Sequence, residues 1–220
     1  EVFKNQLRNR VYNQYHHLYD HDDWWYILDA DELLIQDPSP MLASASKKGC
    51  DSMRVWQAQF YFTDRDYADY KYEDKSKAIS ERRRYYRINW REPRFFKNNP
   101  ERSWSESISG RLPPFCNKYY LNSPICCHYA QRTPEQIKHR VKIRVDNPYS
   151  FFHLKNKNAD SISYWLKSAD KLFLYKGDGQ FQFPIRDRIV YFAREAGYWL
   201  SWRIKGVCNK TKLWLQTVTA

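Results

Sequence analysis

The sequence predicts a mixed α/β fold, in which a sheet is flanked by helices and followed by a helical C-terminal segment. Two strand patterns favour this fold class. Residues 24–28 form a short run of bulky apolar side chains, and residues 51–63 alternate between two faces. Helical patterns surround them, at residues 2–19 with apolar positions three to five apart, and at residues 39–48, which begin with Ser-Pro. We expect the strand at residues 24–28 to lie in the centre of the sheet.

The rest of the chain predicts shorter elements. Residues 64–81 are typical of a polar loop, and Thr133 followed by Pro134 is typical of a helix start. Further strands are expected at residues 84–88, 94–97, 104–108 and 119–129, and further helices at residues 161–175 and 186–205. We therefore divide the chain into a sheet-containing part, residues 1–150, and a helical C-terminal extension, residues 151–220.

Composition and charge restrict the class of protein. The 220 residues suffice for one large domain, and the 18 Tyr, 12 Phe and 9 Trp favour a sheet and pockets for flat or ring-shaped ligands. The net charge of +12 indicates an anionic partner, although three successive arginines, residues 82–84, favour a solvated face. The five cysteines form no C-x-x-C pair, so we expect neither a zinc site nor a disulfide framework. No apolar run approaches the length of a membrane span.

Three acidic residues, Asp29, Asp31 and Glu32, directly follow the first predicted strand. Successive strand residues point to opposite faces, so Asp29 and Asp31 are expected on one side of the sheet. Two neighbouring carboxylates repel each other unless a cation lies between them, and such oxygen ligands suit Mg²⁺ or Mn²⁺. The sequence therefore predicts a divalent metal site here, with Glu32 turned away or fixing neighbouring backbone. The alternative is an acidic turn that caps the strand.

Further segments extend this acidic motif. In chain order they are Trp25-x-x-x-Asp29-Ala30-Asp31-Glu32, a long strand ending near Phe62, Pro93-Arg94-Phe95-Phe96, Trp104-Ser105-Glu106, and His128-Tyr129-x-x-Arg132-Thr133-Pro134-Glu135-Gln136. Over residues 1–145 this order resembles the family 2 glycosyltransferases, which have a GT-A fold. The resemblance implies a GT-A-like mixed sheet, with residues 1–150 as the catalytic part. It also implies a preceding half that holds a nucleotide, so we expect the catalytic part to be incomplete at its N-terminal end.

The resemblance implies metal ligands and suggests donor contacts. Asp31, Asp29 and His128 are the implied ligands of Mn²⁺ or Mg²⁺, and the imidazole favours Mn²⁺. A metal in this position would act as a Lewis acid on the departing diphosphate. For His128 the alternative is a strand-end histidine bonded to backbone. Contacts with the nucleotide sugar are expected from Asp29, Arg132 and Arg8.

Transfer of a sugar to an acceptor hydroxyl needs a base, and the resemblance implies Glu106 in that role. Trp104 would stack on an acceptor sugar, and Arg94 would contact the acceptor through its guanidinium. The alternative is a surface glutamate beside a core tryptophan, in which case Glu101 or Asp64 is the competing candidate for the base.

These expectations describe a metal-dependent glycosyltransferase that moves a sugar, with inversion, from a nucleoside-diphosphate sugar to a glycan or a lipid-linked acceptor. The alternatives are a basic nucleic-acid-binding module, a metal-dependent phosphoryl-transfer enzyme, and a non-catalytic glycan-binding protein. We expect no nucleic-acid partner, because a carboxylate cluster opposes phosphate binding unless a metal is present. A cytoplasmic location is expected. Aromatic and basic residues between 199 and 215 suit peripheral contact with an anionic membrane, although packing against the domain core is the favoured explanation.

Overall fold

The computed structural model describes residues 4–105, 111–145 and 162–193. The chain forms two compact units, residues 1–180 and residues 181–220. This division falls at residue 180, whereas the boundary predicted from the sequence is at residue 150. In the second unit, residues 185–193 are helical, which confirms the described part of the helix expected at residues 186–205. No helix among the described residues combines the length and the apolar character needed to cross a membrane.

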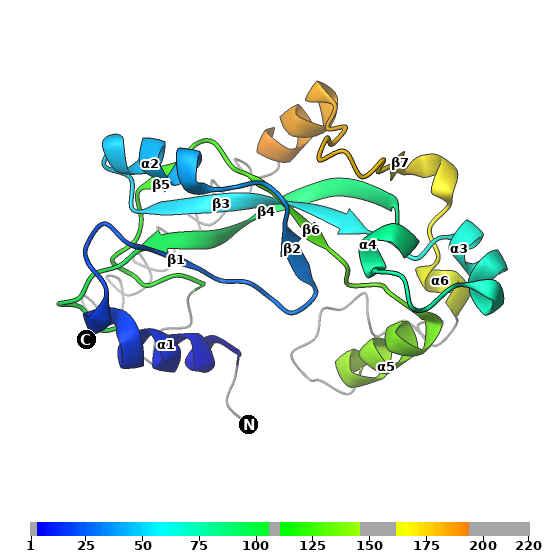
Figure 1. Cartoon of the computed structure of the whole chain (residues 1–220), viewed down its shortest axis with the longest axis horizontal. Coiled ribbons are helices and arrows are strands. Elements are labelled where there is room, and N and C mark those ends of the chain that lie inside the picture. The colour runs from blue at the N-terminus through cyan, green and yellow to red at the C-terminus, as the bar shows by residue number, and fades with distance from the viewer. Residues whose placement is uncertain (1–3, 106–110, 146–161, 194–220) are drawn as a thin grey trace, which may run out of the picture. The chain divides into compact units, whose positions relative to one another are not determined.

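All labelled elements belong to the first unit (Figure 1). The helices are α1 (Lys4–Tyr15), α2 (Ser39–Lys47), α3 (Asp64–Asp69), α4 (Ile79–Arg82), α5 (Pro134–Val145) and α6 (Ile162–Trp165), with short 3₁₀ helices η1 (His16–Leu18), η2 (Tyr70–Tyr72) and η4 (Ala169–Lys171). The strands are β1 (Trp24–Tyr26), β2 (Glu32–Leu34), β3 (Ser52–Phe60), β4 (Tyr85–Lys97), β5 (Tyr119–Tyr120), β6 (Ile125–His128) and β7 (Phe173–Leu174).

The described strands form one seven-stranded mixed sheet, which confirms the predicted fold class at the level of mixed α/β. The strand order is β1-β4-β3-β6-β2, with β5 beside β3 and β7 beside β4. β3 is antiparallel to β4 and parallel to β5 and β6, whereas β1, β2 and β7 pair antiparallel with their neighbours. β1 therefore ends the order, and the prediction that it is central is wrong.

Helices α1 and α2 cover opposite faces of the sheet, which explains the bulky residues of β1 (Figure 1). Tyr12 of α1 packs with Phe96 and Trp25, whereas side chains of α2 pack with Phe95 and Tyr26. Phe95 and Phe96 are successive residues of β4 and so point to opposite faces. The apolar character of β1 thus comes from packing on both of its faces rather than from a central position in the sheet.

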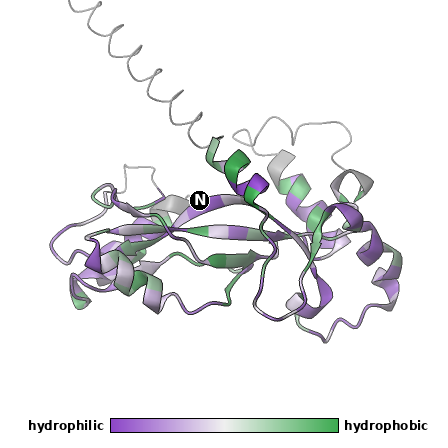
Figure 2. Ribbon diagram, turned by 90° about the horizontal axis from the view of Figure 1, so that it is seen from above, coloured by the Kyte–Doolittle hydropathy of each residue, from purple (hydrophilic) through white to green (hydrophobic). Residues whose placement is uncertain are grey.

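The segment between β3 and β4 is folded, although the sequence predicts a polar loop. Thr63 caps α3 through a capping box in which its side chain and backbone both pair with Asp66. Arg83 is 1% exposed and donates hydrogen bonds to the Glu73 carboxylate and to the backbone carbonyl of Arg132. The solvated face predicted for residues 82–84 is therefore wrong for Arg83, whose charge is neutralised inside a segment that is otherwise mainly hydrophilic (Figure 2).

Three other local predictions differ from the structure. The strands expected at residues 84–88 and 94–97 are one strand, β4, whose pairing with β3 shifts register next to Pro93, a residue without a backbone N–H. The strand expected at 119–129 is divided into β5 and β6. The helix expected at 161–175 ends at Trp165, and β7 instead pairs with β4. Residues 104 and 105 are not in a strand, and the rest of the strand expected there lies outside the described residues.

Candidate functional site

The acidic segment occupies the crossing between the two ends of the sheet. Because β1 and β2 lie at opposite ends of the strand order, residues 27–31 leave the ladder after the Ile27 N–H donates to the Arg94 carbonyl at 2.8 Å. The Glu32 N–H donates to the Asp29 carbonyl at 3.0 Å, so a turn closes here. The strand alternation predicted to align Asp29 with Asp31 is therefore wrong, and the two carboxylates have different partners.

Asp31 meets the histidine of the predicted site. Its Oδ2 lies 3.4 Å from His128 Nε2 and 3.7 Å from Arg140 Nη1, and its carbonyl accepts the Tyr129 N–H at 2.7 Å. The interaction with the His128 ring lowers the pKa of Asp31 to about 2; burial opposes this shift and the Arg140 charge adds to it. Asp31 is therefore a fixed anion at the carboxyl end of β6.

The spacing of Asp31 and His128 suits two ligands of one cation. From the sequence we predict a separation of about 4–6 Å for two ligand atoms that share one ion, and this prediction is wrong, because the observed distance between Asp31 Oδ2 and His128 Nε2 is 3.4 Å. Ligand atoms that each lie about 2.2 Å from one ion, at angles between square and tetrahedral, are about 3.1–3.6 Å apart. His128 Nδ1 is buried and has no hydrogen-bond partner among the described residues, although metal-bound histidines usually donate from this second nitrogen. One carboxylate and one imidazole fit an Mg²⁺ or Mn²⁺ ion that takes its remaining ligands from diphosphate and water.

Asp29 lies among arginines rather than beside His128. Arg94 Nη2 donates to Asp29 Oδ2 at 3.1 Å, and Arg8 Nη2 is 3.5 Å from Asp29 Oδ1. Arg8 and Asp29 both line a cavity of about 320 Å³ between α1 and β1, as their expected donor-binding role would require. Among the described residues, no three His, Cys, Asp or Glu side chains form a group that could hold a metal, so Asp29 does not join the Asp31–His128 pair.

Arg94 and Glu32 form a buried ionic cluster. Arg94, which is 4% exposed, pairs with Glu32 and lies 2.9 Å from Glu92 Oε2. Glu32 also accepts hydrogen bonds from the Gln57 side chain and from the Asp29 N–H, at 3.1 Å each. Burial raises the pKa of Glu32, and the Arg94 charge opposes the rise. Glu32 fixes neighbouring backbone as predicted, whereas Arg94 is enclosed by carboxylates and is not placed to meet an acceptor.

The predicted acceptor side of the site is only partly described. Trp104 is fully buried and makes edge-to-face contacts with Tyr12 and Phe96, with ring centroids at 6.2 and 5.9 Å, so its ring has no exposed surface on which an acceptor sugar could stack. Glu106, the predicted base, lies outside the described residues. Of its two competitors, Glu101 is 82% exposed beside His21, and the Asp64 carboxylate accepts the Ala169 N–H at 2.9 Å.

Arg132, expected to contact the nucleotide sugar, is exposed at the start of the α5 segment. Its backbone carbonyl accepts from Arg83 Nε at 2.8 Å, and its N–H donates to Gln136 Oε1 at 3.3 Å. The position of Arg132 is thus fixed by its backbone, which leaves the guanidinium on the surface.

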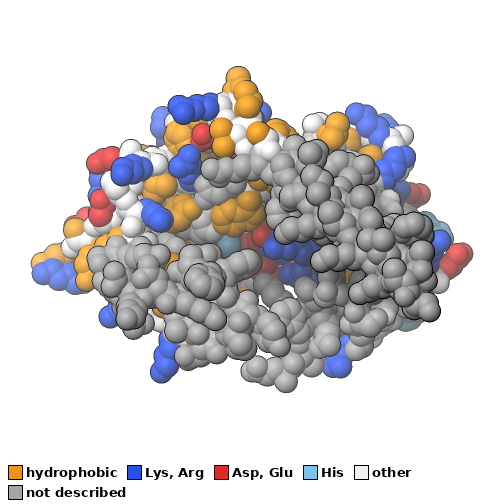
Figure 3. Space-filling view, turned by 180° about the vertical axis from the view of Figure 1, so that it is seen from behind, with side chains coloured by type: hydrophobic (Ala, Val, Ile, Leu, Met, Phe, Trp, Pro, Cys, Tyr) orange, Lys and Arg blue, Asp and Glu red, His pale blue; other side chains and the backbone are white. Residues whose placement is uncertain are grey.

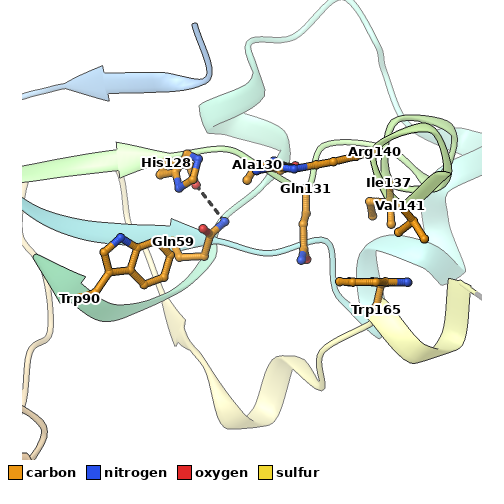
Figure 4. A pocket seen from close by; sticks show the side chains of 9 residues that line it. All are labelled: Gln59, Trp90, His128, Ala130, Gln131, Ile137, Arg140, Val141 and Trp165. Atoms are coloured by element: carbon orange, nitrogen blue, oxygen red, sulfur yellow. Dashed lines mark hydrogen bonds between the residues drawn. The ribbon is translucent and has the colours of Figure 1, made fainter. Parts of the chain in front are cut away.

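A cavity of about 270 Å³ opens beside His128 (Figure 4). Trp90 and Trp165 lie along one side of it in this view, and His128, Ala130 and Arg140 lie along the other. Gln59 Nε2, from the end of β3, donates to the His128 carbonyl at 3.3 Å. On the face opposite to that of Figure 1, acidic and basic side chains meet near the centre, next to hydrophobic ones (Figure 3). The cavity thus combines an aromatic side with a side that can form hydrogen bonds.

Sequence reasoning missed most residues that line this cavity. Arg140 has a local signal, because it lies four residues after Gln136 on the helix predicted from Thr133, and both side chains donate to the Ala130 carbonyl, at 2.8 and 3.0 Å. Trp90 and Trp165 carry no such signal, since only the sheet pairing and the packing of α6 bring them to His128.

The fold and the site define a mixed α/β protein with a carboxylate–imidazole pair at the carboxyl end of a central strand and an aromatic-lined cavity beside it. No family model matches the chain, and no curated protein or solved structure matches it either.

Proposed function

We propose that the chain is the catalytic part of a glycosyltransferase whose donor is a nucleoside-diphosphate sugar. The observation that carries the proposal is the 3.4 Å approach of His128 Nε2 to Asp31 Oδ2. These residues come from opposite ends of the series of motifs that resembles the family 2 glycosyltransferases. Neither residue depends on the other through local chain geometry, so their meeting supports the function implied by that resemblance.

The residues of this site have distinct roles in the proposal. Asp31 and His128 would hold Mn²⁺ or Mg²⁺, and a bound ion would supply the positive charge that a departing diphosphate needs. Asp31 remains ionised through the physiological range because its pKa is about 2. Arg140 holds the Ala130 carbonyl and lies beside the carboxylate, so it fixes the wall of the cavity from which the reaction would proceed. Trp90 and Trp165 supply apolar surface of the kind on which sugar rings stack.

The proposal names the acceptor only by its chemical class. A glycan or a lipid-linked acceptor, transfer with inversion, and Glu106 as the base remain part of it, and contact with a membrane surface is an extension of it. Glu106 would take the proton of the acceptor hydroxyl, for which it must approach that group directly or through one water. None of the contacts of the described residues favours the nucleic-acid or phosphoryl-transfer alternatives over this function.

Asp31→Asn and His128→Ala test the proposal, with Asp69→Asn as the matched control on the exposed surface of α3. The parent is expected to show a Mn²⁺-dependent rise in melting temperature with one member of a panel of nucleoside diphosphates. It should also release that diphosphate from the matching sugar nucleotide, as the sugar passes to a glycan hydroxyl or to water. Asp31→Asn preserves shape and removes the charge, so activity should fall on the order of 10²-fold or more while the fold is retained. Activity equal to the parent in both site variants would overturn the proposal.

A further inference from the structure

A second cavity, of about 600 Å³, lies on the other face of the sheet from the candidate site. Successive residues point to opposite faces: His128 lines the first cavity, and the next residue, Tyr129, lines the second. Tyr129 is 2% exposed and stacks on Phe60 with ring centroids 4.5 Å apart, which makes a rigid floor. This cavity therefore has its own walls and shares only backbone with the Asp31–His128 site.

Three cationic side chains from separate segments line the second cavity: Lys77, Arg84 and Lys176. Arg84 is held in place, since its Nε donates to the Tyr175 carbonyl at 3.1 Å and its own carbonyl accepts the Tyr175 N–H at 2.8 Å. Within the described part of the chain, none of the three cations lies within ion-pair distance of a carboxylate, although the charge of Lys77 contributes to the lowered pKa of Asp74. Like charges that line one cavity repel each other, and an anion bound between them removes that repulsion.

The carboxylate of Glu81 is the acidic group on this wall, and it is already engaged. Its Oε2 accepts the Ala78 N–H at 3.0 Å in the cap of α4. Three cations and one carboxylate leave the lining with a net positive charge. Gly177, with a φ of +83°, presents backbone without a side chain beside Lys176. The lining is thus open to an anion with several oxygens.

One wall of the same cavity is apolar. Leu33 and Ile35, at the edge of the sheet, are 44% and 40% exposed and line the cavity with aliphatic surface. A surface that joins exposed aliphatic groups to unpaired cations suits a ligand with a charged head and an adjoining apolar part.

We propose that this second cavity binds the phosphate group of a phosphorylated ligand, carried either by a lipid or by a free phosphate ester. Lys77, Arg84 and Lys176 would contact the phosphate oxygens, with Arg84 preset by its bond to Tyr175. Leu33 and Ile35 would cover the neighbouring apolar atoms of the ligand. The site is separate from the proposed donor site, and its occupation does not require a divalent metal.

The test uses the full chain in EDTA, so that metal-dependent binding at Asp31 and His128 is absent. Inorganic pyrophosphate is titrated by calorimetry, and vesicles of phosphatidylcholine with or without phosphatidic acid are used for sedimentation. The variant is Lys77→Gln with Lys176→Gln, because these substitutions remove no described hydrogen bond or ion pair of the folded protein. The matched control, Lys138→Gln with Lys142→Gln, removes the same charge from the exposed side of α5.

The parent and the control should bind alike, and the cavity variant should bind roughly tenfold more weakly for each cation removed, since a charge-assisted hydrogen bond contributes about 1.5 kcal/mol or more. Binding of pyrophosphate alone favours a water-soluble phosphate ligand, and binding of phosphatidic acid vesicles alone favours a lipid headgroup. Equal binding by the cavity variant and the parent, or binding of neither probe by the parent, overturns the proposal. Both results leave the metal-dependent test of the glycosyltransferase unaffected.

Discussion

Replacing Arg83 by methionine should destabilise the protein more than replacing any of its surface arginines. The Arg83 guanidinium is 1% exposed, donates to both carboxylate oxygens of Glu73, and lies 4.6 Å above the Phe62 ring. It also donates to the Arg132 carbonyl at 2.8 Å, so it joins the segment before β4 to the segment after β6. Methionine fills much of the same space but leaves the Glu73 carboxylate, which is 13% exposed, without its main partner.

The magnitude follows from the partners that remain. Removing one member of a buried ion pair costs about 3–5 kcal/mol, because the other charge stays buried. Arg82 Nη1 still lies 3.1 Å from Glu73 Oε2, which favours the lower end, about 3 kcal/mol. With a urea m-value of about 1–3 kcal/mol/M, the midpoint of unfolding should fall by roughly 1–3 M.

The assay is urea unfolding at neutral pH, followed by circular dichroism, with Arg84→Met as the control. Arg84 is exposed and adjacent in sequence, and its replacement loses only the hydrogen bond to the Tyr175 carbonyl, so it should cost about 1 kcal/mol or less. The double variant Arg83→Met with Glu73→Leu should recover part of the loss, since it removes the carboxylate that the single variant leaves unpaired. The recovery is partial, because Arg82 then loses its ion-pair partner and Asp66 keeps only its hydrogen bonds to Thr63. A single variant within about 0.5 kcal/mol of the parent would refute this account of a buried clamp.

Three further predictions concern acid, packing and a turn. Burial alone would raise the pKa of Glu73, but the hydrogen bonds and charges of Arg83 and Arg82 lower it. The stabilisation from this ion pair should therefore be present above the ordinary pKa of 4.5 and be lost as the pH falls below it. A urea midpoint that does not change between pH 6 and about pH 3 would contradict this. Trp104→Ala should lower the free energy of unfolding by about 3–5 kcal/mol, because the ring is fully buried, whereas a change in acceptor affinity at unaltered stability would restore its predicted acceptor role. Gly49→Ala should cost about 1–2 kcal/mol, since Gly49 has a φ of +63° and a Cβ would lie 3.3 Å from Lys118 Nζ; thermal melting equal to the parent would contradict the strain.

Local signals in the sequence account for the elements that were predicted well. The Ser-Pro and Thr-Pro starts place α2 and α5 within a residue or two, and the alternation at residues 51–63 marks β3. The edge position of β1 has no such signal, because the pairing of Trp25 with Phe96 joins segments far apart in the chain. Propensity also failed at Arg83, where a tertiary ion pair buries a residue type that is almost always exposed.

The candidate site was predictable where a motif, rather than periodicity, carried the information. His128 and Asp31 were paired on the resemblance alone, and the structure brings them into contact. Strand alternation misplaced Asp29, because the backbone turns there. The aromatic side of the cavity depends on where β4 and α6 pack. The residues next to Trp90 and Trp165 in the sequence do not predict that packing.

All four residues of β6 pair with β3 in parallel, and three of them, residues 126–128, also pair with β2 antiparallel. Side chains alternate with a period of two along such a strand, so the assignment of each residue to a face has only two states. One residue inserted before His128 would carry the imidazole to the face that now holds the Tyr129 ring, and the phenol to the face of the Asp31 carboxylate. A shift of one residue in this short strand would therefore change the side chains that line both cavities at once. A substitution of His128 or Tyr129 would alter one cavity and leave the other unchanged.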